Sequence, residues 1–368
     1  MEPAARRRTL AVKVGPLTIG GGAPVVIQSM TNTRSSDIDA TLEQIRLLAA
    51  AGCELVRVAV PDETAAAALA ELVKKSPLPL VADIHFDIRL AYRALEAGVP
   101  KVRINPGNIG GREKLRELCR RAEDCGAALR IGVNAGSLDR RLLKKHGGIT
   151  AAALVESALE YLDEVEATGF RAIVVSLKAS DVPTTIEAYR LMSRKARYPL
   201  HLGVTAAGPL DIGTIKGAVG IGTLLAEGIG DTIRVSLTAP PVEEVRVARQ
   251  ILEVLHLRPQ GGPELISCPT CGRCTVDLVP LVEEVSRLLR GCPHPVKVAV
   301  MGCAVNGPGE AREADIGITA GRRRGLIFRR GKVVRTVPQE RLLEALQEEL
   351  DALDLSGEFG NAGGGEDK

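Results

Sequence analysis

Residues 78–105 read LPLVADIHFDIRLAYRALEAGVPKVRIN, and this stretch contains the unit that decides the fold. A β-rich run, Leu78–Ile84, is followed by a helical pattern, Arg89–Ala97, and then by a second β-rich run, Lys101–Asn105. Strands that alternate with helices of this length are typical of βαβ units, in which the two strands lie parallel. We therefore predict an α/β protein built around a parallel sheet.

The same alternation extends from about residue 25 to residue 255. The expected strands are Val25–Met30, Leu55–Val60, Leu78–Ile84, Lys101–Asn105, Arg130–Asn134, Ala172–Leu177, His201–Thr205 and Thr232–Leu237. Helical patterns separate them, for example Thr41–Ala51, Thr64–Lys75, Arg89–Ala97, Arg112–Cys125, Thr150–Thr168 and Thr184–Lys195. Eight βα units predict a (β/α)8 barrel of the TIM type. A doubly wound open sheet is the alternative, but the Gly-x-Gly-x-x-Gly turn that it favours does not follow Met30.

A smaller α/β domain is expected after the barrel. The segment Pro259–Pro263 (PQGGP) has the composition of a linker, so we expect a barrel domain over residues 1–258 and a second domain over residues 264–354. Its expected elements are helices at Leu278–Leu289 and Gln339–Leu353, strands at Val296–Val300 and Asp315–Thr319, and a hairpin of Gly325–Phe328 and Lys332–Thr336 turned at Arg330-Gly331. Residues 355–368 are Gly-rich and acidic and are predicted to be a disordered tail.

Composition excludes several classes of protein. The 368 residues are 45% hydrophobic and 25% charged, as in ordinary soluble proteins. The net charge of +3, with 2% aromatic residues and no Trp, gives no support for nucleic-acid binding. No apolar run is long enough to span a membrane, and no apolar segment typical of a signal peptide follows the basic residues Arg6–Arg8. We expect a cytoplasmic protein that binds neither nucleic acid nor membrane.

Eight cysteines at irregular spacing favour metal binding over a disulfide framework in an intracellular protein. Three of them, Cys53, Cys119 and Cys125, lie in apolar helical or near-strand settings and are expected to be buried thiols. A second group is found in Ser267-Cys-Pro-Thr-Cys-Gly-Arg273 and Met301-Gly-Cys-Ala-Val-Asn-Gly-Pro-Gly-Glu310.

Cys268, Cys271, Cys303 and Glu310 form a candidate metal site within this second group. Neighbouring thiolates hold zinc or iron–sulfur clusters, and a zinc ribbon would need a second closely spaced pair. Three thiolates with one carboxylate would leave one corner of a metal weakly held and open to a substrate oxygen, which indicates redox chemistry. Spacing alone makes Cys274 as good a ligand as Cys303, and Glu310 could equally be a solvated loop carboxylate. Cys292 is expected to be a bystander.

Polar residues recur where the predicted strands end, which is where TIM barrels carry their active sites. They include Gln28, Asn32, Arg57, Asp83, His85, Asp87, Arg103, Asn105, Asn108, Arg130, Asn134, Ser176, Lys178, His201, Thr205, Arg234 and Ser236. Five are cations on five different strands: Arg57, Arg103, Arg130, Lys178 and Arg234. Buried like charges need an anion or paired carboxylates, and arginine suits phosphate oxygens. The expected ligand is therefore a small phosphate ester with several charges; alternatively, each cation pairs with a local acid such as Asp83 or Asp231.

Six motifs together carry a resemblance to a known family. They are QSMTNT (28–33), ADIHFD (82–87), VRINPGNIG (102–110), LGVT (202–205), SCPTCGR (267–273) and MGCAVNGPGE (301–310). From Val14 to about Leu350 the chain resembles the 4-hydroxy-3-methylbut-2-en-1-yl diphosphate synthase family, the iron–sulfur reductases of the methylerythritol phosphate isoprenoid pathway.

The resemblance implies a [4Fe–4S] cluster held by Cys268, Cys271, Cys303 and Glu310, without Cys274. The implied reaction is reductive ring opening and dehydration of 2-C-methyl-D-erythritol 2,4-cyclodiphosphate to the linear 4-hydroxy-3-methylbut-2-enyl diphosphate, with electrons from flavodoxin or ferredoxin. A head-to-tail homodimer is also implied, in which the cluster domain of one subunit closes over the barrel of the other.

The expected substrate-binding residues are Arg57, Arg103, Arg130, Asn134, Lys178, Arg234, Ser236 and Asn306. The expected catalytic residues are Glu310, Lys178, Asp87 and His85. One position departs from the family pattern, because Gly203-Val-Thr-Ala-Ala-Gly208 has Ala206 where the family has a glutamate that faces the substrate. This departure predicts impaired turnover unless Asp87, His85 or water supplies the acid.

Two other functions stay open at this point. One is a non-catalytic metal-binding protein whose barrel binds a phosphate ligand. The other is a redox-neutral phosphate-sugar aldolase with Lys178 as the Schiff-base residue, which would leave the cysteines unexplained. The basic stretch Arg322–Arg330 suits docking of an acidic electron carrier, or is simply a solvated hairpin.

Overall fold

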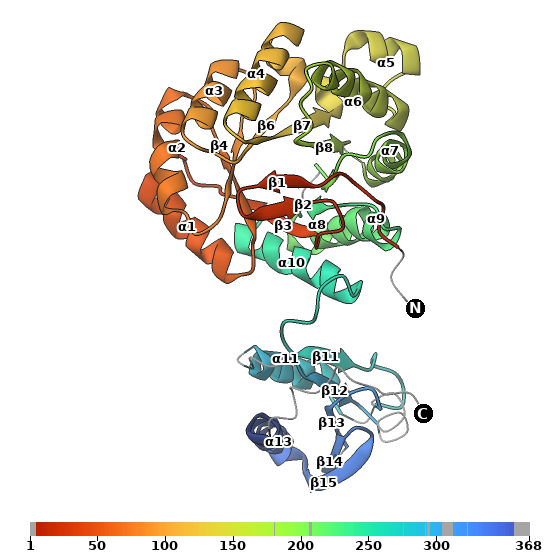
Figure 1. Cartoon of the computed structure of the whole chain (residues 1–368). Helices are drawn as coiled ribbons and strands as arrows, with labels where there is room; N and C mark the ends of the chain where they lie inside the picture. Colours follow the sequence, from red (N-terminus) through yellow and green to blue (C-terminus); the bar gives the residue numbers. More distant parts are fainter. Residues whose placement is uncertain are drawn as a thin grey trace, which may run out of the picture. The chain divides into compact units, whose positions relative to one another are not determined.

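The computed structural model describes residues 5–356, apart from residues 180, 206, 207, 275, 291, 293, 294, 304–311 and 322. The chain forms two compact units, Met1–Arg258 and Pro259–Lys368 (Figure 1). The predicted disordered tail lies outside the described residues from position 357 onward, and its first two residues, 355 and 356, belong to the last helix.

The first unit is a barrel of parallel strands (Figure 1). Within the described residues its eight strands follow the order β8-β7-β6-β5-β4-β3-β10-β9. A parallel bridge between Val175 of β8 and Leu200, next to β9, joins the two ends of the sheet. The strands are β3 (Val26–Met30), β4 (Leu55–Ala59), β5 (Leu80–Asp83), β6 (Lys101–Ile104), β7 (Ala128–Asn134), β8 (Ile173–Lys178), β9 (His201–Leu202) and β10 (Thr232–Ile233). The prediction of a (β/α)8 barrel is confirmed.

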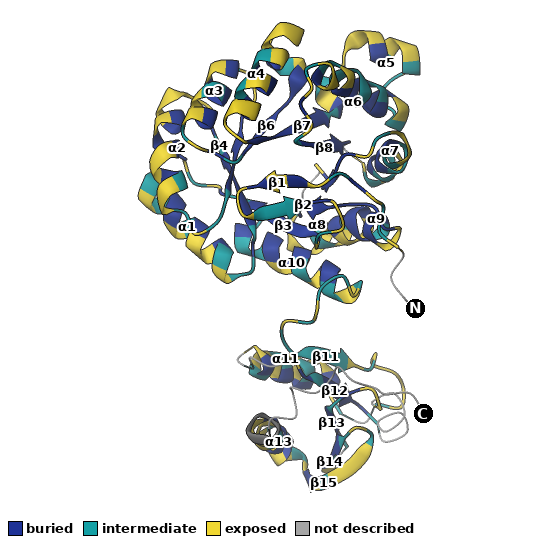
Figure 2. Ribbon diagram, in the orientation of Figure 1, coloured by how far each residue is buried: buried dark blue, intermediate teal, exposed yellow. Residues whose placement is uncertain are grey.

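Helices surround the strands and turn their apolar faces inward (Figure 2). They are α1 (Ile38–Ala50), α2 (Glu63–Lys75), α3 (Ile88–Glu96), α4 (Arg112–Asp124), α5 (Arg140–His146), α6 (Ala151–Glu166), α7 (Val182–Lys195), α8 (Leu210–Gly217), α9 (Thr223–Ala226) and α10 (Pro241–Val254), with the short 3-10 helices η1 (Pro106–Asn108) and η2 (Ala135–Ser137) and the π-helix η3 (Ala218–Gly222). Side chains cap several N-termini, including Asp37, Asp62, Asp87, Thr150 and Asp181. Each cap fixes where a βα loop ends and a helix begins, which holds the loops at the barrel mouth in place.

An N-terminal hairpin closes the opposite end of the barrel, and the sequence did not predict it. Its strands β1 (Val12–Val14) and β2 (Leu17–Ile19) pair antiparallel around Gly15, which has a positive φ of 56°. Buried side chains of the hairpin pack against the first or second residue of five barrel strands, namely Val26, Leu55, Val81, Ala128 and Val174. This seal leaves the carboxyl ends of the strands as the open end of the barrel.

The second unit contains a sheet of order β11-β12-β13-β14-β15. Strands β11 (Glu264–Ser267), β12 (Lys297–Met301) and β13 (Ile316–Thr319) are parallel, while β14 (Arg324–Arg329) and β15 (Lys332–Pro338) form the antiparallel hairpin. Helices α11 (Leu278–Leu289) and α13 (Leu342–Ser356), the latter preceded by η4 (Gln339–Arg341), complete its apolar core. The predicted turn is confirmed, since Arg330 and Gly331 have φ values of 45° and 76°. Strand β11 was not predicted.

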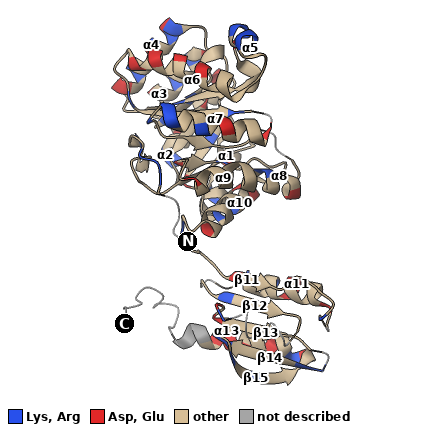
Figure 3. Ribbon diagram, turned by 90° about the vertical axis from the view of Figure 1, so that its right-hand side faces the viewer, with Lys and Arg blue, Asp and Glu red and all other residues tan. Residues whose placement is uncertain are grey.

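The outer surface carries both signs of charge over the helices (Figure 3). Exposed ion pairs such as Arg141–Glu160 and Arg190–Glu227 join neighbouring elements. No helix in the described part of the chain is long and apolar enough to cross a membrane. Cys53 and Cys119 are buried as predicted, but the prediction for Cys125 is wrong: it follows the last turn of α4 and is exposed to solvent.

Candidate active site

A cavity of about 150 Å³ opens at the carboxyl ends of the barrel strands. All five cations singled out in the sequence lie in its lining, although they come from five different strands. The described lining residues are Arg57, Asp83, His85, Arg103, Arg130, Asn134, Ser176, Lys178, Thr205, Arg234 and Ser236. Successive parallel strands deliver these side chains to one place because their carboxyl ends meet at the same end of the barrel.

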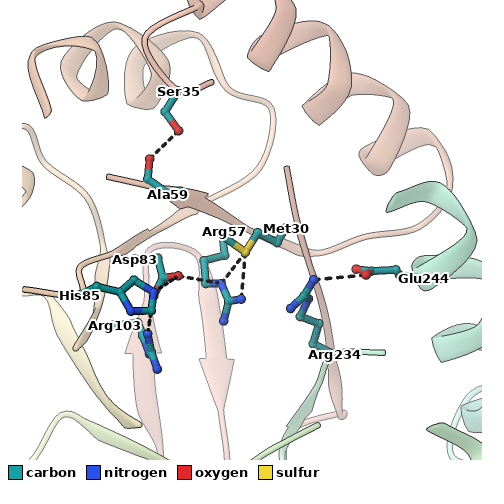
Figure 4. Close-up of polar contacts among 9 residues, drawn as sticks. All are labelled: Met30, Ser35, Arg57, Ala59, Asp83, His85, Arg103, Arg234 and Glu244. Atoms are coloured by element: carbon teal, nitrogen blue, oxygen red, sulfur yellow. Dashed lines mark hydrogen bonds and ion pairs between the residues drawn. The ribbon is translucent and has the colours of Figure 1, made fainter. Parts of the chain in front are cut away.

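Asp83 is the one carboxylate among the described lining residues, and it joins three of its neighbours (Figure 4). Its Oδ1 accepts from Arg103 Nη1 at 3.0 Å, and its Oδ2 lies 3.2 Å from His85 Nε2 and 3.6 Å from Arg57 Nε. Burial alone would raise the pKa of this carboxyl, but Arg57, the hydrogen bond from His85 and Arg103 together hold the pKa well below its usual value. Asp83 is therefore a permanent anion that orients two arginines and a histidine.

The remaining positive charge is not balanced within the cavity. Among the described residues, neither Arg130 nor Lys178 forms an ion pair, and Arg130 Nε and Nη1 are buried without a hydrogen-bond partner. Burial, followed by the nearby arginines, holds the pKa of both side chains well below the usual value. The alternative prediction, in which each cation pairs with its own acid, is therefore wrong. Asp231, one of the acids it named, pairs with Arg6. Unbalanced, oriented donors of this kind suit an anion with several oxygens.

Arg57 and Arg234 are held by groups that the sequence did not reveal as part of the site. Arg57 Nε and Nη2 contact Met30 Sδ at 3.0 and 2.9 Å. Arg234 Nη2 lies 3.2 Å from Oε1 of Glu244, a buried carboxylate on α10 (Figure 4). Glu244 also accepts from the Ser29 hydroxyl and the Leu237 amide, each at 3.1 Å. Glu244 lies on the same face of α10 as the buried apolar residues, and this spacing in the sequence could have identified it as a buried carboxylate.

Two glycines make room for the charged side chains. A β-carbon at Gly132 would lie 3.0 Å from Arg103 Nε and 3.2 Å from Ser176 Oγ. At Gly203 it would lie 3.2 Å from Lys178 Nζ and 3.0 Å from the Arg234 carbonyl oxygen. Any larger residue at either position would displace a cavity cation, which gives the Leu202-Gly-Val-Thr205 motif a physical reason.

The other predicted site residues fall in different places. Asn134 and Ser236 line the cavity, and His85 stands at its rim with 48% of its side chain exposed. Asp87 is not among the lining residues, because it caps α3 and binds the Arg89 guanidinium at 2.7 Å. Asn306 and Ala206 lie outside the described residues, although Ala206 directly follows Thr205 of the lining.

In the second unit, the cysteine segments follow two neighbouring strand ends. Ser267 of β11 is in register with Val300 of β12, so Cys268 and the Gly302-Cys303 pair leave the sheet side by side. The Gly302 amide donates to Cys268 Sγ at 3.3 Å, and Cys274 Sγ packs so closely on Gly302 that a β-carbon there would collide with it. The backbone amide of Arg273 is the main cause of a lowered Cys271 pKa, which favours thiolate.

These donors suit an iron–sulfur cluster, whose sulfur ligands commonly accept amide hydrogen bonds. Among the described residues, no three His, Cys, Asp or Glu side chains gather closely enough to hold a metal ion. Glu310, the fourth predicted ligand, lies outside the described residues.

Comparison with known proteins places the chain in a family. Residues 9–249 match the GcpE TIM-barrel domain and residues 264–352 match the GcpE protein C-terminal domain. The chain is 56% identical over 348 residues to the 4-hydroxy-3-methylbut-2-en-1-yl diphosphate synthase (flavodoxin) of Geobacillus kaustophilus, covering 95% of this chain and 93% of the relative. For the Bacillus subtilis synthase of the same name the identity is 54%, covering 95% of this chain and 92% of the relative.

A solved structure supports the barrel fold independently. The type I 3-dehydroquinate dehydratase of Clostridium difficile matches with a TM-score of 0.50 at 14% identity, covering 68% of this chain and 98% of that protein. This likeness concerns the fold alone. The sequence matches, in contrast, span both units, and the chain belongs to the GcpE family of 4-hydroxy-3-methylbut-2-en-1-yl diphosphate synthases.

Proposed function

We propose that this chain converts 2-C-methyl-D-erythritol 2,4-cyclodiphosphate into 4-hydroxy-3-methylbut-2-en-1-yl diphosphate in cytoplasmic isoprenoid precursor biosynthesis. The C2–O bond to the ring phosphate breaks, the C3 hydroxyl leaves as water, and a C2=C3 double bond forms. A pair of electrons and a pair of protons are consumed. The observation that carries the proposal is the cavity itself, where five cations meet one carboxylate at the open end of the barrel.

In this proposal the cyclic diphosphate supplies the anionic oxygens that the cavity lacks. Arg57, Arg103, Arg130, Lys178 and Arg234 bind the phosphates, with Asn134, Ser236 and Asn306 as further hydrogen-bond partners. Asp83 and Glu244 hold three of the arginines before the substrate arrives. Because the donors are already oriented, little ordering cost accompanies binding.

Proton transfer is assigned to Lys178 and His85. Lys178 lies within the cavity, and burial and the surrounding arginines favour loss of its proton. His85 is at the rim, bonded to Asp83 and partly open to solvent, so it can exchange protons with water. Asp87 was a further candidate; because it caps α3 and binds Arg89, its proposed role is instead to position the β5–α3 loop.

The cofactor in the proposal is a [4Fe–4S] cluster held by Cys268, Cys271, Cys303 and Glu310. When bound, such a cluster supplies electrons one at a time. Cys274 packs against Gly302, whose amide donates to Cys268, and it is the competing candidate for a cluster ligand.

Flavodoxin is the proposed electron donor, with ferredoxin as the alternative, because the named relatives are flavodoxin-type synthases. Arg323, Arg324 and Arg330 are exposed on the β14–β15 hairpin, whereas Arg329 pairs with Glu349. If this hairpin steers an acidic carrier, raising the salt concentration slows electron delivery. Rates that do not depend on salt would contradict docking at this surface.

The deciding experiment is anaerobic purification followed by quantitation of iron and sulfide and by an assay with the cyclic diphosphate and reduced flavodoxin. We expect a brown protein that forms the linear diphosphate, and an Arg130→Met variant that keeps its iron but loses turnover. A colourless protein that holds zinc would favour the non-catalytic metal-binding alternative.

The proposed homodimer has its own test. Arg130→Met removes a barrel cation and Cys303→Ser removes a cluster ligand, so each variant alone is expected to be inactive. If the cluster unit of one subunit serves the barrel of the other, mixing the two variants restores part of the activity. No recovery after subunit exchange would show that each chain serves itself.

A further inference from the structure

Beneath the cavity, the barrel interior holds two more ionisable side chains. Lys101 of β6 and His201 of β9 are both 0% exposed, and neither belongs to the cavity lining. Residues two apart on a strand face the same side, so Lys101 lies one layer below Arg103 and His201 one layer below Gly203. Lys101 Nζ and His201 Nε2 have no hydrogen-bond partner among the described residues.

Among the described residues, no carboxylate forms an ion pair with either group, and the buried Asp231, next to Thr232, is engaged by Arg6, Thr9 and the Leu200 amide. The charged, titratable and polar side chains that the surrounding elements contribute to the interior include Gln28 of β3, Arg57 of β4, Asp83 of β5, Arg103 of β6, Arg130 of β7, Ser176 and Lys178 of β8, Thr232 of β10, Arg234 directly after it, and Tyr189 of α7. Asp83 is already engaged by two arginines and His85. Below this layer the apolar side chains of the β1–β2 hairpin close the barrel. Lys101 and His201 are thus buried bases surrounded mainly by cations.

These surroundings favour the neutral form of both groups in the free protein. Burial, then Arg130 and Arg57, hold the pKa of Lys101 well below its usual value. For His201 the causes of the lowered pKa are burial, then Arg130, Lys178 and Lys101. An anion in the cavity reverses part of this effect, because negative charge one layer above stabilises the protonated forms in a medium that screens charge poorly.

We propose that Lys101 and His201 form a buried proton-accepting pair that takes up protons when an anion fills the cavity above them. The inference rests on the proposed function only for the identity of that anion. The proposed reaction consumes protons and turns a cyclic diphosphate into a terminal one, which carries more negative charge. The pair would hold positive charge beneath the place where negative charge accumulates during turnover.

Proton uptake gives a definite sign to the pH dependence of binding. If the bound state carries more protons than the free state, affinity falls as pH rises, by about tenfold per pH unit for each full proton taken up. Arginine is not deprotonated in proteins near neutral pH, even where burial lowers its pKa, so the arginines do not produce this dependence.

The test is calorimetric titration with trimetaphosphate, a cyclic phosphate anhydride whose own charges do not titrate near neutral pH. Binding heats in buffers of different ionisation enthalpy give the number of protons exchanged. We expect uptake by the wild-type chain and a clear loss of uptake in Lys101→Met and in His201→Asn. Lys75→Met removes an exposed lysine on α2 that pairs with Glu71, and is expected to behave as wild type.

The outcomes separate this inference from the proposed function. Trimetaphosphate binding without proton exchange overturns the inference, even if the chain turns over the cyclic diphosphate. Unchanged uptake in both variants also overturns it, since Lys178 would then be the acceptor. If Lys101→Met does not fold, the conservative His201→Asn variant and the pH dependence of the wild-type affinity decide. Conversely, uptake that disappears in the variants supports the pair, even if no turnover is found.

Discussion

Arg103 donates from Nη1 to Oδ1 of Asp83 across 3.0 Å, and both side chains are buried in the barrel mouth. The pairing follows from the sheet itself, because Asp83 of β5 is directly in register with Arg103 of β6. Arg57 comes from the strand on the other side, β4, whose Ala59 is in register with Asp83. One carboxylate between two arginine-bearing strands therefore organises one side of the cavity before any ligand binds.

Asp83→Asn is expected to destabilise the free protein strongly. It leaves Arg57 and Arg103 buried without their anion, and breaking a buried pair in this way typically costs about 3–5 kcal/mol. A bound phosphate anion supplies the missing charge, so trimetaphosphate should recover more stability in the variant than in the wild type. Chemical denaturation with and without the anion measures this difference. Asp87→Asn, which weakens a helix cap at the surface, serves as the control and should show no such recovery; equal behaviour of the two variants would contradict the assignment.

The free energy of unfolding of the ligand-free barrel is expected to rise with pH between about 6.5 and 8. Lys101 and Lys178 have folded-state pKa values far below their usual ones, so the unfolded chain binds more protons than the folded chain in this window. Stability rises with pH under that condition, by up to about 1.4 kcal/mol per pH unit for each group that stays neutral when folded. His201 adds to the slope only near the lower end of the window, since an unfolded histidine loses its proton there.

Tyrosine fluorescence is the measurement, since all four tyrosines of the chain, Tyr92, Tyr161, Tyr189 and Tyr198, belong to the barrel unit. Urea unfolding at several pH values gives the slope, and Lys101→Met should reduce it by the contribution of one group. The window stops below pH 8.5 because Cys53 and Cys119, whose pKa values are raised to about 11, begin to act in the opposite direction there. A stability that falls between pH 6.5 and 8 would contradict neutral buried lysines.

The barrel could be predicted because its strands are apolar runs separated by helices, a pattern that depends on burial of both faces of the sheet. The hairpin of β1 and β2 could not be predicted, since strands of three residues leave no periodic signal in the sequence. Strands β9 and β10 were predicted to be longer than they are, since only two residues of each strand pair in the sheet. The polar residues that follow these two strands point toward the cavity and do not pair in the sheet. Only the three-dimensional packing shows where the strand pairing stops.

The cavity cations could be predicted because parallel strands bring their carboxyl ends together wherever the polar residues begin. The different roles of Asp83 and Asp87 could not be predicted, since both residues lie near the end of the same expected strand. Asp83 is the last residue of β5 and faces inward, whereas Asp87 is the N-cap residue of α3. Glu244 was missed because it lies on a helix far along the chain, and its burial depends on contact with Ser29 and Arg234.

Ala206→Glu is expected to raise turnover at least tenfold, a change in barrier of about 1.4 kcal/mol. The position directly follows Thr205 of the cavity lining, and the family resemblance implies a glutamate there, so we expect the added carboxylate to bring an acid group to the substrate. Steady-state rates with the cyclic diphosphate measure the effect, and Ala206→Gln separates the acid from added bulk. No gain for the glutamate variant would mean that His85, Lys178 or water already supplies the proton.

Cys303→Ser is expected to abolish both the visible absorbance of the cluster and turnover, whereas Cys274→Ser keeps both. Both thiols lie near Gly302, so spacing and packing alone leave Cys274 as a competitor, and only the paired variants distinguish them. The barrel has its own apolar core and should stay folded in each variant, which tyrosine fluorescence checks. Cys125→Ser, at an exposed thiol of the barrel, controls for the loss of a cysteine as such. The reverse result, with absorbance lost in Cys274→Ser and kept in Cys303→Ser, would make Cys274 the ligand. Loss of absorbance in both variants would instead add Cys274 to the three cysteine ligands in place of the carboxylate; the cluster would then be closed at every corner, and the corner that the proposed chemistry leaves to the substrate would no longer exist.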